Sequence, residues 1–308
     1  MKSRAVGGWA RHYESTALTA ELRARSVLSY TPDGILVDSI QQGRKEFTVN
    51  YNARDLIPTP RWKLLRDELK ESGTRLFRWR SYFPVVLLVL VLLLDYLVQP
   101  RRSGLSQNLV WDFVCLGVSL LGLVVRAATI GCVPYGTSVR STKAQQAETL
   151  NASGMYSIVR HPLYLGNFLV WIGLSLILAD WVVTLIVILA FWLTHERIMM
   201  SEEAFLEQKF GPQFCEWART TPPFLPRFSQ WRPPSLSFSF RNVLKREYSG
   251  FFAIVCGFVA LRTWAIFLGT GQWTFDRVSQ VILAIGVVVY LGLMFLKKST
   301  TLLNVEGR

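Results

Sequence analysis

The chain has 308 residues, of which 51% are hydrophobic, and a formal net charge of +13. That charge suits nucleic acid or anionic lipid, but the apolar residues gather in long runs, so we interpret the basic residues as holding loops on the cytoplasmic side of a membrane. The cysteines, Cys115, Cys132, Cys215 and Cys256, form no CxxC pair or other metal spacing, which argues against a disulfide framework and against a zinc site.

Residues 1–80 are polar and contain two predicted local structures. A turn signature at residues 31–34 is followed by apolar residues 35–37 and by the alternating stretch 47–51, which predicts a small β-hairpin. From residue 60 to residue 80, Trp, Leu and Phe interleave with Arg and Lys. This pattern favours an interfacial amphipathic helix leading to the membrane, although an ordinary solvated helix has a similar pattern.

Six apolar runs follow, and each predicts a membrane-crossing helix. They cover residues 82–98, 109–132, 163–178, 181–194, 250–268 and 278–296. The third and fourth runs are short and meet at Asp180, which predicts a helical hairpin whose second helix continues towards Phe210. The fold class expected is therefore all-α: a polytopic membrane bundle of about six spans, with a small polar N-terminal region of α+β character.

The distribution of Lys and Arg predicts the orientation of these spans. Six crossings place both termini on one side, together with residues 133–160, 197–248 and the Lys297–Lys298 pair, and their basic residues mark that side as cytoplasmic. We expect three parts: a cytoplasmic N-terminal region (1–80), a membrane core (81–249) and two additional C-terminal spans with a short basic tail (250–308).

A polar cluster, residues 154–166, stands at the mouth of the third run. Charge near hydrocarbon is costly, so Arg160 and His161 at this depth suggest a functional site. Each residue also has a simpler explanation. Pro162 favours a first helical turn, Arg160 can anchor a helix end at the headgroups, and Tyr164 fits an aromatic belt.

The second half of the predicted site lies about forty residues later. Arg197, Glu202, Glu203, Phe210 and Gly211 follow directly from a membrane helix. A pair of glutamates is usually a solvated acidic face, but this pair lies on the side that is otherwise rich in cations. Both halves of the site fall on the same predicted cytoplasmic face.

Together the two halves resemble a family. The pattern G-x-Y-x-x-x-R-H-P-x-Y-x-G, followed after a helical hairpin by E-E-x-x-L-x-x-x-F-G, is similar to the isoprenylcysteine carboxyl methyltransferase and phospholipid methyltransferase group. The resemblance covers about residues 122–227. The matching residues are Gly154, Tyr156, Arg160, His161, Pro162, Tyr164, Gly166, Glu202, Glu203, Leu206, Phe210, Gly211, Pro222, Leu225 and Pro226.

The resemblance implies an integral membrane enzyme that uses S-adenosylmethionine and needs no metal. It implies that Arg160, His161, Tyr164, Gly166, Glu202 and Glu203 line the cofactor site. We add Tyr156 and Pro162 of the same motif to the cofactor-binding residues and predict catalytic roles for Arg197, Glu203 and His195. These residue types suit the cofactor, because glutamate accepts hydrogen bonds from an ammonium or a ribose diol and arginine holds a carboxylate.

The acceptor is expected to be a membrane lipid or a lipidated molecule rather than nucleic acid. A carboxylate or phosphate oxygen is nucleophilic without a base, whereas a headgroup amine needs a general base such as a glutamate or His195. Arg126, inside the second run, either faces the acceptor, pairs with a glutamate or snorkels to the surface. The alternative function is a non-catalytic membrane scaffold that binds a lipid or a partner.

Overall fold

A computed structural model describes residues 26–30, 36–42, 45–51, 65–98, 108–134, 136, 147–305 and 307. The chain separates into two compact units, residues 1–64 and 65–308. The helix that follows residue 64 belongs to the second unit.

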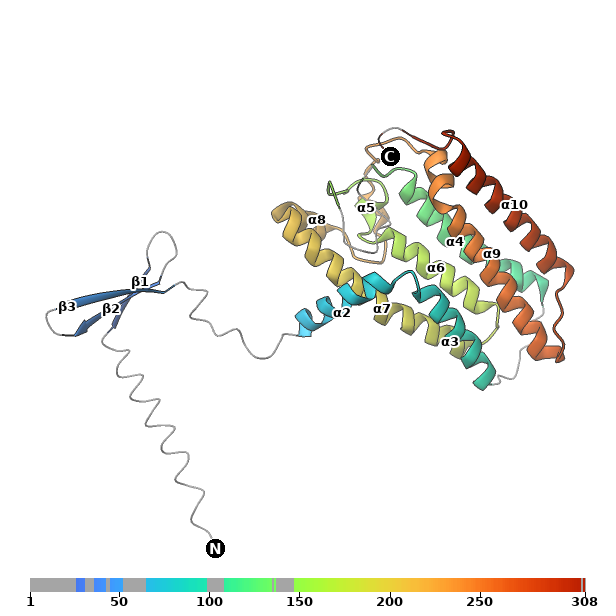
Figure 1. The fold of residues 1–308 in the computed structure, drawn as a ribbon, viewed down its shortest axis with the longest axis horizontal. Coiled ribbons are helices and arrows are strands. Elements are labelled where there is room, and N and C mark those ends of the chain that lie inside the picture. Colours follow the sequence, from blue (N-terminus) through green and yellow to red (C-terminus); the bar gives the residue numbers. More distant parts are fainter. Residues whose placement is uncertain are drawn as a thin grey trace, which may run out of the picture. The chain divides into compact units, whose positions relative to one another are not determined.

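The first unit contains an antiparallel sheet of three strands in the order β1-β2-β3 (Figure 1). The strands are β1 (Ser26–Tyr30), β2 (Leu36–Gln42) and β3 (Lys45–Tyr51). In the register, Leu28 lies opposite Asp38, and Asp38 lies opposite Val49. β2 and β3 occupy the region where the alternating pattern predicts a hairpin.

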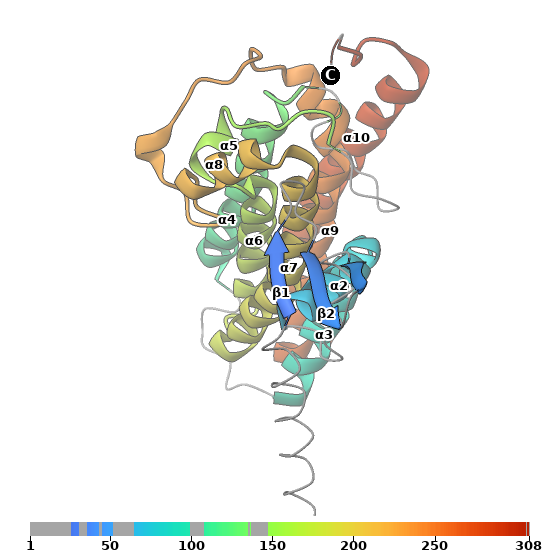
Figure 2. The ribbon, with the colours of Figure 1, turned by 90° about the vertical axis from the view of Figure 1, so that its left-hand side faces the viewer.

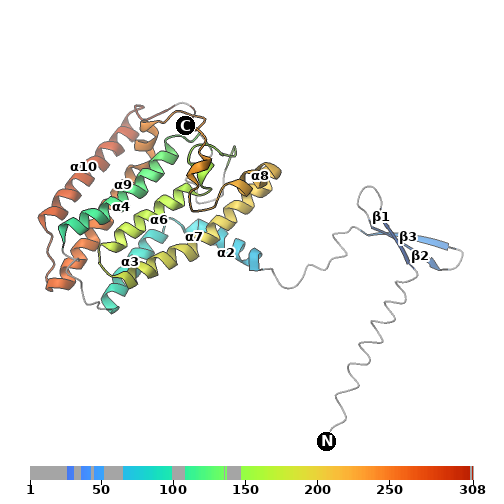
Figure 3. The ribbon, with the colours of Figure 1, turned by 180° about the vertical axis from the view of Figure 1, so that it is seen from behind.

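The second unit is a helical bundle (Figures 1 and 3). α4 packs against α6 and α9, α9 packs against α10, and α7 packs against α6, α3 and α2. Figure 2 shows α5 and α8 at the end of the bundle where α9 begins and α10 ends. The helices are α2 (Leu65–Trp79), α3 (Phe83–Val98), α4 (Leu109–Ile130), α5 (Met155–Ile158), α6 (Pro162–Leu176), α7 (Trp181–Phe210), α8 (Pro212–Thr220), η2 (Phe228–Gln230), α9 (Phe240–Thr270) and α10 (Arg277–Ser299).

Polar side chains begin four of the long helices. Asn108, Asp180, Ser239 and Asp276 each accept a hydrogen bond from a backbone N–H in the first turn of α4, α7, α9 and α10, respectively. These N-caps satisfy donors that a helix leaves unpaired. The turn at Asp180 confirms the predicted hairpin of α6 and α7.

Apolar helices lie at all six predicted positions, but they differ in length. α4, α7, α9 and α10 are long and apolar enough to cross a membrane, and the bent pair α2–α3 makes a fifth candidate. α6 has only 15 residues, because it starts at Pro162 and the chain turns back before Asp180. The composition and length of these helices support an integral membrane protein.

Two features of the helices place the charged residues at one end of the bundle. α7 is a single helix of 30 residues, about 45 Å long, which exceeds the roughly 30 Å hydrocarbon core. Its C-terminal third, with Glu202 and Glu203, continues past the apolar part, as predicted. At the same end, α2 meets α3 at an angle of 91°, a geometry that suits a surface helix joined to a span.

The crossing between α4 and α6 is close, because small residues face each other there. A Cβ atom at Gly122 would overlap the carbonyl oxygen of Gly166, and a Cβ atom at Gly173 would overlap Ser119. The Ser119 hydroxyl donates to the carbonyl of Val170 at 3.1 Å. Small residues allow this backbone contact, which is a common way to pack membrane helices.

Gly122→Ala should therefore destabilise the bundle by about 1–3 kcal/mol, because the new methyl group pushes α4 away from α6. Gly117→Ala on the same helix is the matched control, since no atom lies within 4 Å of the position of its Cβ. Thermal unfolding in detergent, followed by circular dichroism, measures both variants. Equal unfolding midpoints for the two variants would contradict the close crossing.

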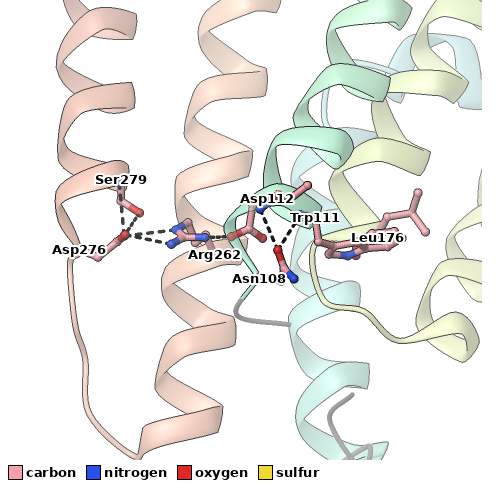
Figure 4. A network of polar contacts seen from close by, with 8 residues as sticks. Asn108, Trp111, Asp112, Leu176, Arg262, Asp276 and Ser279 are labelled. Atoms are coloured by element: carbon pink, nitrogen blue, oxygen red, sulfur yellow. Dashed lines mark hydrogen bonds and ion pairs between the residues drawn. The ribbon is translucent and has the colours of Figure 1, made fainter. Parts of the chain in front are cut away.

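At the end of the bundle opposite to Glu202 and Glu203, Arg262 of α9 joins α4 and α10 (Figure 4). Its guanidinium forms an ion pair with Asp112 of α4, which is 1% exposed, and donates to Asp276 at 3.0 Å. Asp276 also accepts hydrogen bonds from the Ser279 hydroxyl at 2.6 Å and from the Ser279 backbone N–H, and the second of these bonds caps α10. The network ties the two C-terminal helices to α4.

Removing this arginine should be costly. Arg262→Met leaves Asp112 buried without its cation, and breaking a buried ion pair in this way costs about 3–5 kcal/mol. The expected result is a clearly lower unfolding midpoint in detergent. Arg277→Gln, an exposed arginine at the start of α10, serves as the control and should unfold like the wild type. If Arg262→Met also unfolds like the wild type, the network does not hold these helices together.

Candidate functional site

The N-terminal half of the site is an irregular segment that leads into α6. Gly154, with a φ of 59°, precedes the single turn of α5, and Val159 returns to an extended conformation. His161 is the residue before the helix, and Pro162 is its first residue, a position that suits proline. This geometry places Arg160 and His161 at the mouth of α6.

A third segment, residues 221–227, holds this mouth from outside by backbone hydrogen bonds. The Arg160 N–H donates to the carbonyl of Pro222 at 2.8 Å, and the His161 N–H donates to Pro223 at 3.2 Å. The Arg227 N–H donates to the carbonyl of Ile158 at 2.9 Å. The proline-containing segment that the resemblance included is therefore a wall of the site.

Arg160, His161 and Glu203 form a hydrogen-bonded cluster between α6 and α7. Arg160 Nη1 donates to Glu203 Oε2 at 2.7 Å, and His161 Nε2 lies 2.9 Å from Glu203 Oε1. Charged pairs at these distances are the stronger kind of protein hydrogen bond. Two residues about forty positions apart in the sequence thus meet, as the two-part motif predicted.

Glu202 extends the cluster towards α2. The Tyr164 hydroxyl donates to Glu202 Oε1 at 2.7 Å, and Nη1 of Arg80 lies 3.6 Å from the same oxygen. His161 Nδ1 lies 3.7 Å from Glu202 Oε2, so the imidazole stands between the two glutamates. We call Arg80, Arg160, His161, Tyr164, Glu202 and Glu203 the charge network.

Beneath the charge network lies an apolar floor of buried side chains from four elements. Phe77 of α2, Tyr164 of α6 and Phe191 of α7 pack together. The cluster also contains Ile198, Met199 and Phe224. Such a floor keeps water away from one side of the charged groups and so strengthens their mutual attraction.

Two of the residues predicted to be catalytic lie outside the charge network. His195 is buried, its Nδ1 lies 3.0 Å from the carbonyl of Phe191, and its ring is stacked on Phe191 with centroids 3.7 Å apart. In the part of the chain that the structure describes, no hydrogen bond or ion pair joins the Arg197 side chain to Glu202 or Glu203. The catalytic roles of His195 and Arg197 stay predictions.

The other predicted residues have structural positions next to the network. The carbonyl of Tyr156 accepts a hydrogen bond from the Trp217 indole at 3.0 Å, which joins α5 to α8. Gly166 lies against α4, where a Cβ would approach Cγ of Arg126 to 2.5 Å. In the described part of the chain, no group of three His, Cys, Asp or Glu residues has the arrangement of a metal site.

An open pocket of about 480 Å³ borders the charge network on the side of Arg160. Its lining includes three arginines and the proline segment: Arg160, Ala218, Arg219, Thr220, Thr221, Pro222, Pro223, Leu225, Pro226 and Arg227. Its volume falls in the usual range of about 300–1,000 Å³ for sites of small molecules. The cations in its wall suit an anionic group.

Arg126 pairs with a glutamate, one of the alternatives that the sequence left open. Its guanidinium donates to both carboxylate oxygens of Glu247 on α9, at 2.8 and 2.9 Å, and to Asn167 Oδ1 at 2.7 Å. Asn167 follows Gly166, so this two-pronged ion pair ties α9 to the end of the motif.

Sequence reasoning missed Arg80 and Glu247. Both lie outside residues 122–227, the range of the resemblance, and both lie in stretches where basic and acidic residues are common. Arg80 looked like one of several cations that anchor a surface helix. Its place directly before the first apolar run was a local hint, because a cation at the end of a predicted span lies at the same membrane depth as Arg160 and His161.

Comparison with known proteins finds relatives of the membrane core. A family model described as Phospholipid methyltransferase matches residues 113–213. The Nickel-cobalt-cadmium resistance protein NccN of Alcaligenes xylosoxydans xylosoxydans is 34% identical over 163 residues, 51% of this chain and 67% of that protein. Protein-S-isoprenylcysteine O-methyltransferase A of Arabidopsis thaliana is 30% identical over 137 residues, 44% of this chain and 69% of that protein.

A yeast relative matches a shorter stretch. The Protein-S-isoprenylcysteine O-methyltransferase of Schizosaccharomyces pombe is 29% identical over 120 residues, 38% of this chain and 50% of that protein. The chain thus spans about half to two thirds of the length of these relatives. No solved structure matches the chain.

The charge network predicts the effect of neutralising one carboxylate. Glu203→Gln keeps the shape of the side chain but weakens the hydrogen bonds with Arg160 and His161, and we expect a loss of about 1–3 kcal/mol in the free energy of unfolding. Thermal unfolding in detergent measures the change.

Glu196→Gln is the matched control for this variant, because Glu196 is an exposed glutamate on the same helix. Its unfolding midpoint should equal that of the wild type. A Glu203→Gln variant as stable as Glu196→Gln would show that the two halves of the site are not held together by this carboxylate.

Proposed function

The chain belongs to the phospholipid methyltransferase and isoprenylcysteine methyltransferase family of membrane methyltransferases, and we propose that it transfers a methyl group from S-adenosylmethionine to a lipid or a lipid-bearing acceptor at the cytoplasmic face of the membrane. The observation that carries this proposal is the meeting of α6 and α7 at the charge network. Arg160 and His161 contact Glu203 there, at one end of an apolar bundle.

The charge network fits the polar groups of S-adenosylmethionine. The donor has a cationic ammonium group, an anionic carboxylate and a ribose diol. The side chains of Glu202 and Glu203 are about one quarter exposed, so they can accept hydrogen bonds from the ammonium or the diol. Arg160 borders the open pocket and would hold the carboxylate. We propose that Tyr156, Pro162 and Gly166 shape the same site.

When bound, the donor supplies a methyl group that its sulfonium already activates. The work left to the protein is to align the acceptor, to orient the carboxylates and to exclude water. His161 and Tyr164 orient Glu203 and Glu202 through the contacts described above. The apolar floor, whose Tyr164 and Phe191 rings contact the His195 ring, excludes water from one side of the site.

The charge distribution supports the proposed orientation, with several spans and both termini in the cytoplasm. The site end of the bundle includes Lys297 and Lys298 in the last turn of α10. It also includes Lys245 at the start of α9, which donates to Asn304 at 2.8 Å. Basic residues favour the cytoplasmic side. We retain the proposal of a core at residues 81–249 flanked by the N-terminal region and the last two spans.

The proposal is tested by binding and by labelling. Purified full-length protein should bind S-adenosylmethionine in isothermal titration calorimetry, and Glu202→Gln should weaken the binding about tenfold, since a charge-assisted hydrogen bond is lost. Membranes that contain the protein, incubated with methyl-labelled donor, should place the label in a lipid or lipidated-protein fraction.

Glu196→Gln again provides the control and should bind the donor like the wild type. Wild-type protein that binds no donor and labels no fraction would overturn the enzymatic proposal. The result would favour the alternative of a non-catalytic scaffold that binds lipid or a partner.

A further inference from the structure

Arg80 is a component of the charge network that comes from outside the segment matched by the family model. It follows α2 directly, at the corner where α2 and α3 meet at 91°. Its guanidinium carbon lies 4.0 Å from the centroid of the Phe77 ring, and Nη1 lies 3.6 Å from Glu202 Oε1. The side chain is 23% exposed, so a ligand in the site can reach it.

The position of Arg80 is fixed by the way α2 packs on α7. A Cβ at Gly73 would overlap the carbonyl oxygen of Arg197, so the two backbones touch. One residue later, the Thr74 hydroxyl lies 2.9 Å from that of Ser201. Phe77, further along α2, is part of the apolar floor. α2 is therefore a wall of the site and presents Arg80 to it.

The corner also has the features of a membrane boundary. Trp79 and Tyr82 flank Arg80, are 66% and 62% exposed, and have ring centroids 5.5 Å apart. Exposed Trp and Tyr side chains next to an apolar helix are typical of the headgroup level. A lipid-anchored acceptor presents its polar end at this depth while its chain stays in the bilayer.

The charges in the site suggest different roles for Arg160 and Arg80. The two glutamates balance Arg80 and Arg160. A donor with a sulfonium, an ammonium and a carboxylate brings one net positive charge, which an anionic acceptor neutralises. Arg160 makes a hydrogen bond of 2.7 Å to Glu203 and borders the open pocket, whereas Arg80 lies next to Glu202, between the exposed Trp79 and Tyr82.

We propose that Arg80 binds the anionic group of the methyl acceptor, so that α2 determines which acceptors enter the site. This inference rests on the proposed function. The guanidinium holds one oxygen of a carboxylate or phosphate, and another oxygen of that group attacks the methyl carbon. A C–O bond forms, the S–C bond breaks with its electron pair going to sulfur, and no proton is transferred.

Binding without donor tests the proposal separately from turnover. The full-length protein in phosphatidylcholine nanodiscs is titrated with N-acetyl-S-farnesylcysteine, with its neutral carboxamide and, in a separate arm, with phosphatidic acid. Arg80→Ala should weaken binding of the anionic probe about tenfold or more and leave the carboxamide unaffected. Arg80→Lys should restore part of the affinity. The anionic probe that the wild type binds identifies the source as a carboxylate or a phosphate.

Arg78→Ala is the matched control, because Arg78 is exposed in the last turn of α2, two residues before Arg80. It should bind every probe like the wild type. The assignment of Arg80 is overturned if the wild type binds neither anionic probe, if Arg80→Ala weakens the carboxamide as much as the carboxylate, or if Arg78→Ala has the same effect as Arg80→Ala. The proposed function predicts that the wild type binds S-adenosylmethionine whatever the results for Arg80 are. Titration of the wild type with S-adenosylmethionine therefore distinguishes failure of the Arg80 assignment from failure of the proposed function.

Discussion

Two adjacent carboxylates at the edge of an apolar bundle impose the constraint on which the site depends. Glu202 and Glu203 repel each other and lose hydration, so each needs a cation nearby. Glu203 obtains Arg160 from the segment before α6, and Glu202 obtains Arg80 from the end of α2. His161 stands between them. The electrostatic requirement of one pair of residues on α7 therefore fixes where α2, α6 and α7 meet.

The parts of this arrangement that were predictable from sequence are the local ones. Hydropathy located the apolar helices, and the motif predicted that His161 and Glu203 lie near each other, because one half precedes the first helix of the hairpin and the other half ends its second helix. Side-chain partners across the bundle depend on helix crossings, which no periodicity records. Arg126 had three reasonable interpretations, and its partner Glu247 lies 121 residues further along the chain. Arg80 was overlooked for the same reason.

The two C-terminal helices extend the bundle of the second unit, since α9 packs against α4 and α10 packs against α9. The family-matched segment contains Arg126 and Asn167 but ends before Glu247. Without α9, Arg126 would be a charge inside the bundle without its carboxylate, which is strongly unfavourable. Arg126 also lies directly against Gly166, so the placement of α9 bears on the last residue of the motif. α9, on which α10 packs, thus stabilises the α6 side of the site through Arg126. α2 forms the wall of the site on the α7 side.

The two ends of the bundle use paired charges in different ways. At the far end, Arg262 closes on Asp112, which is 1% exposed and makes its contacts within the protein. Such a pair holds helices together and leaves no surface for a ligand. At the site end, Glu202 and Glu203 remain about one quarter exposed beside an open pocket. If these two positions served only to pack the helices together, apolar side chains of similar size would stabilise the bundle at least as well as two glutamates. A charge network kept partly open to the outside is instead the arrangement that recognition of a charged donor and an anionic acceptor requires.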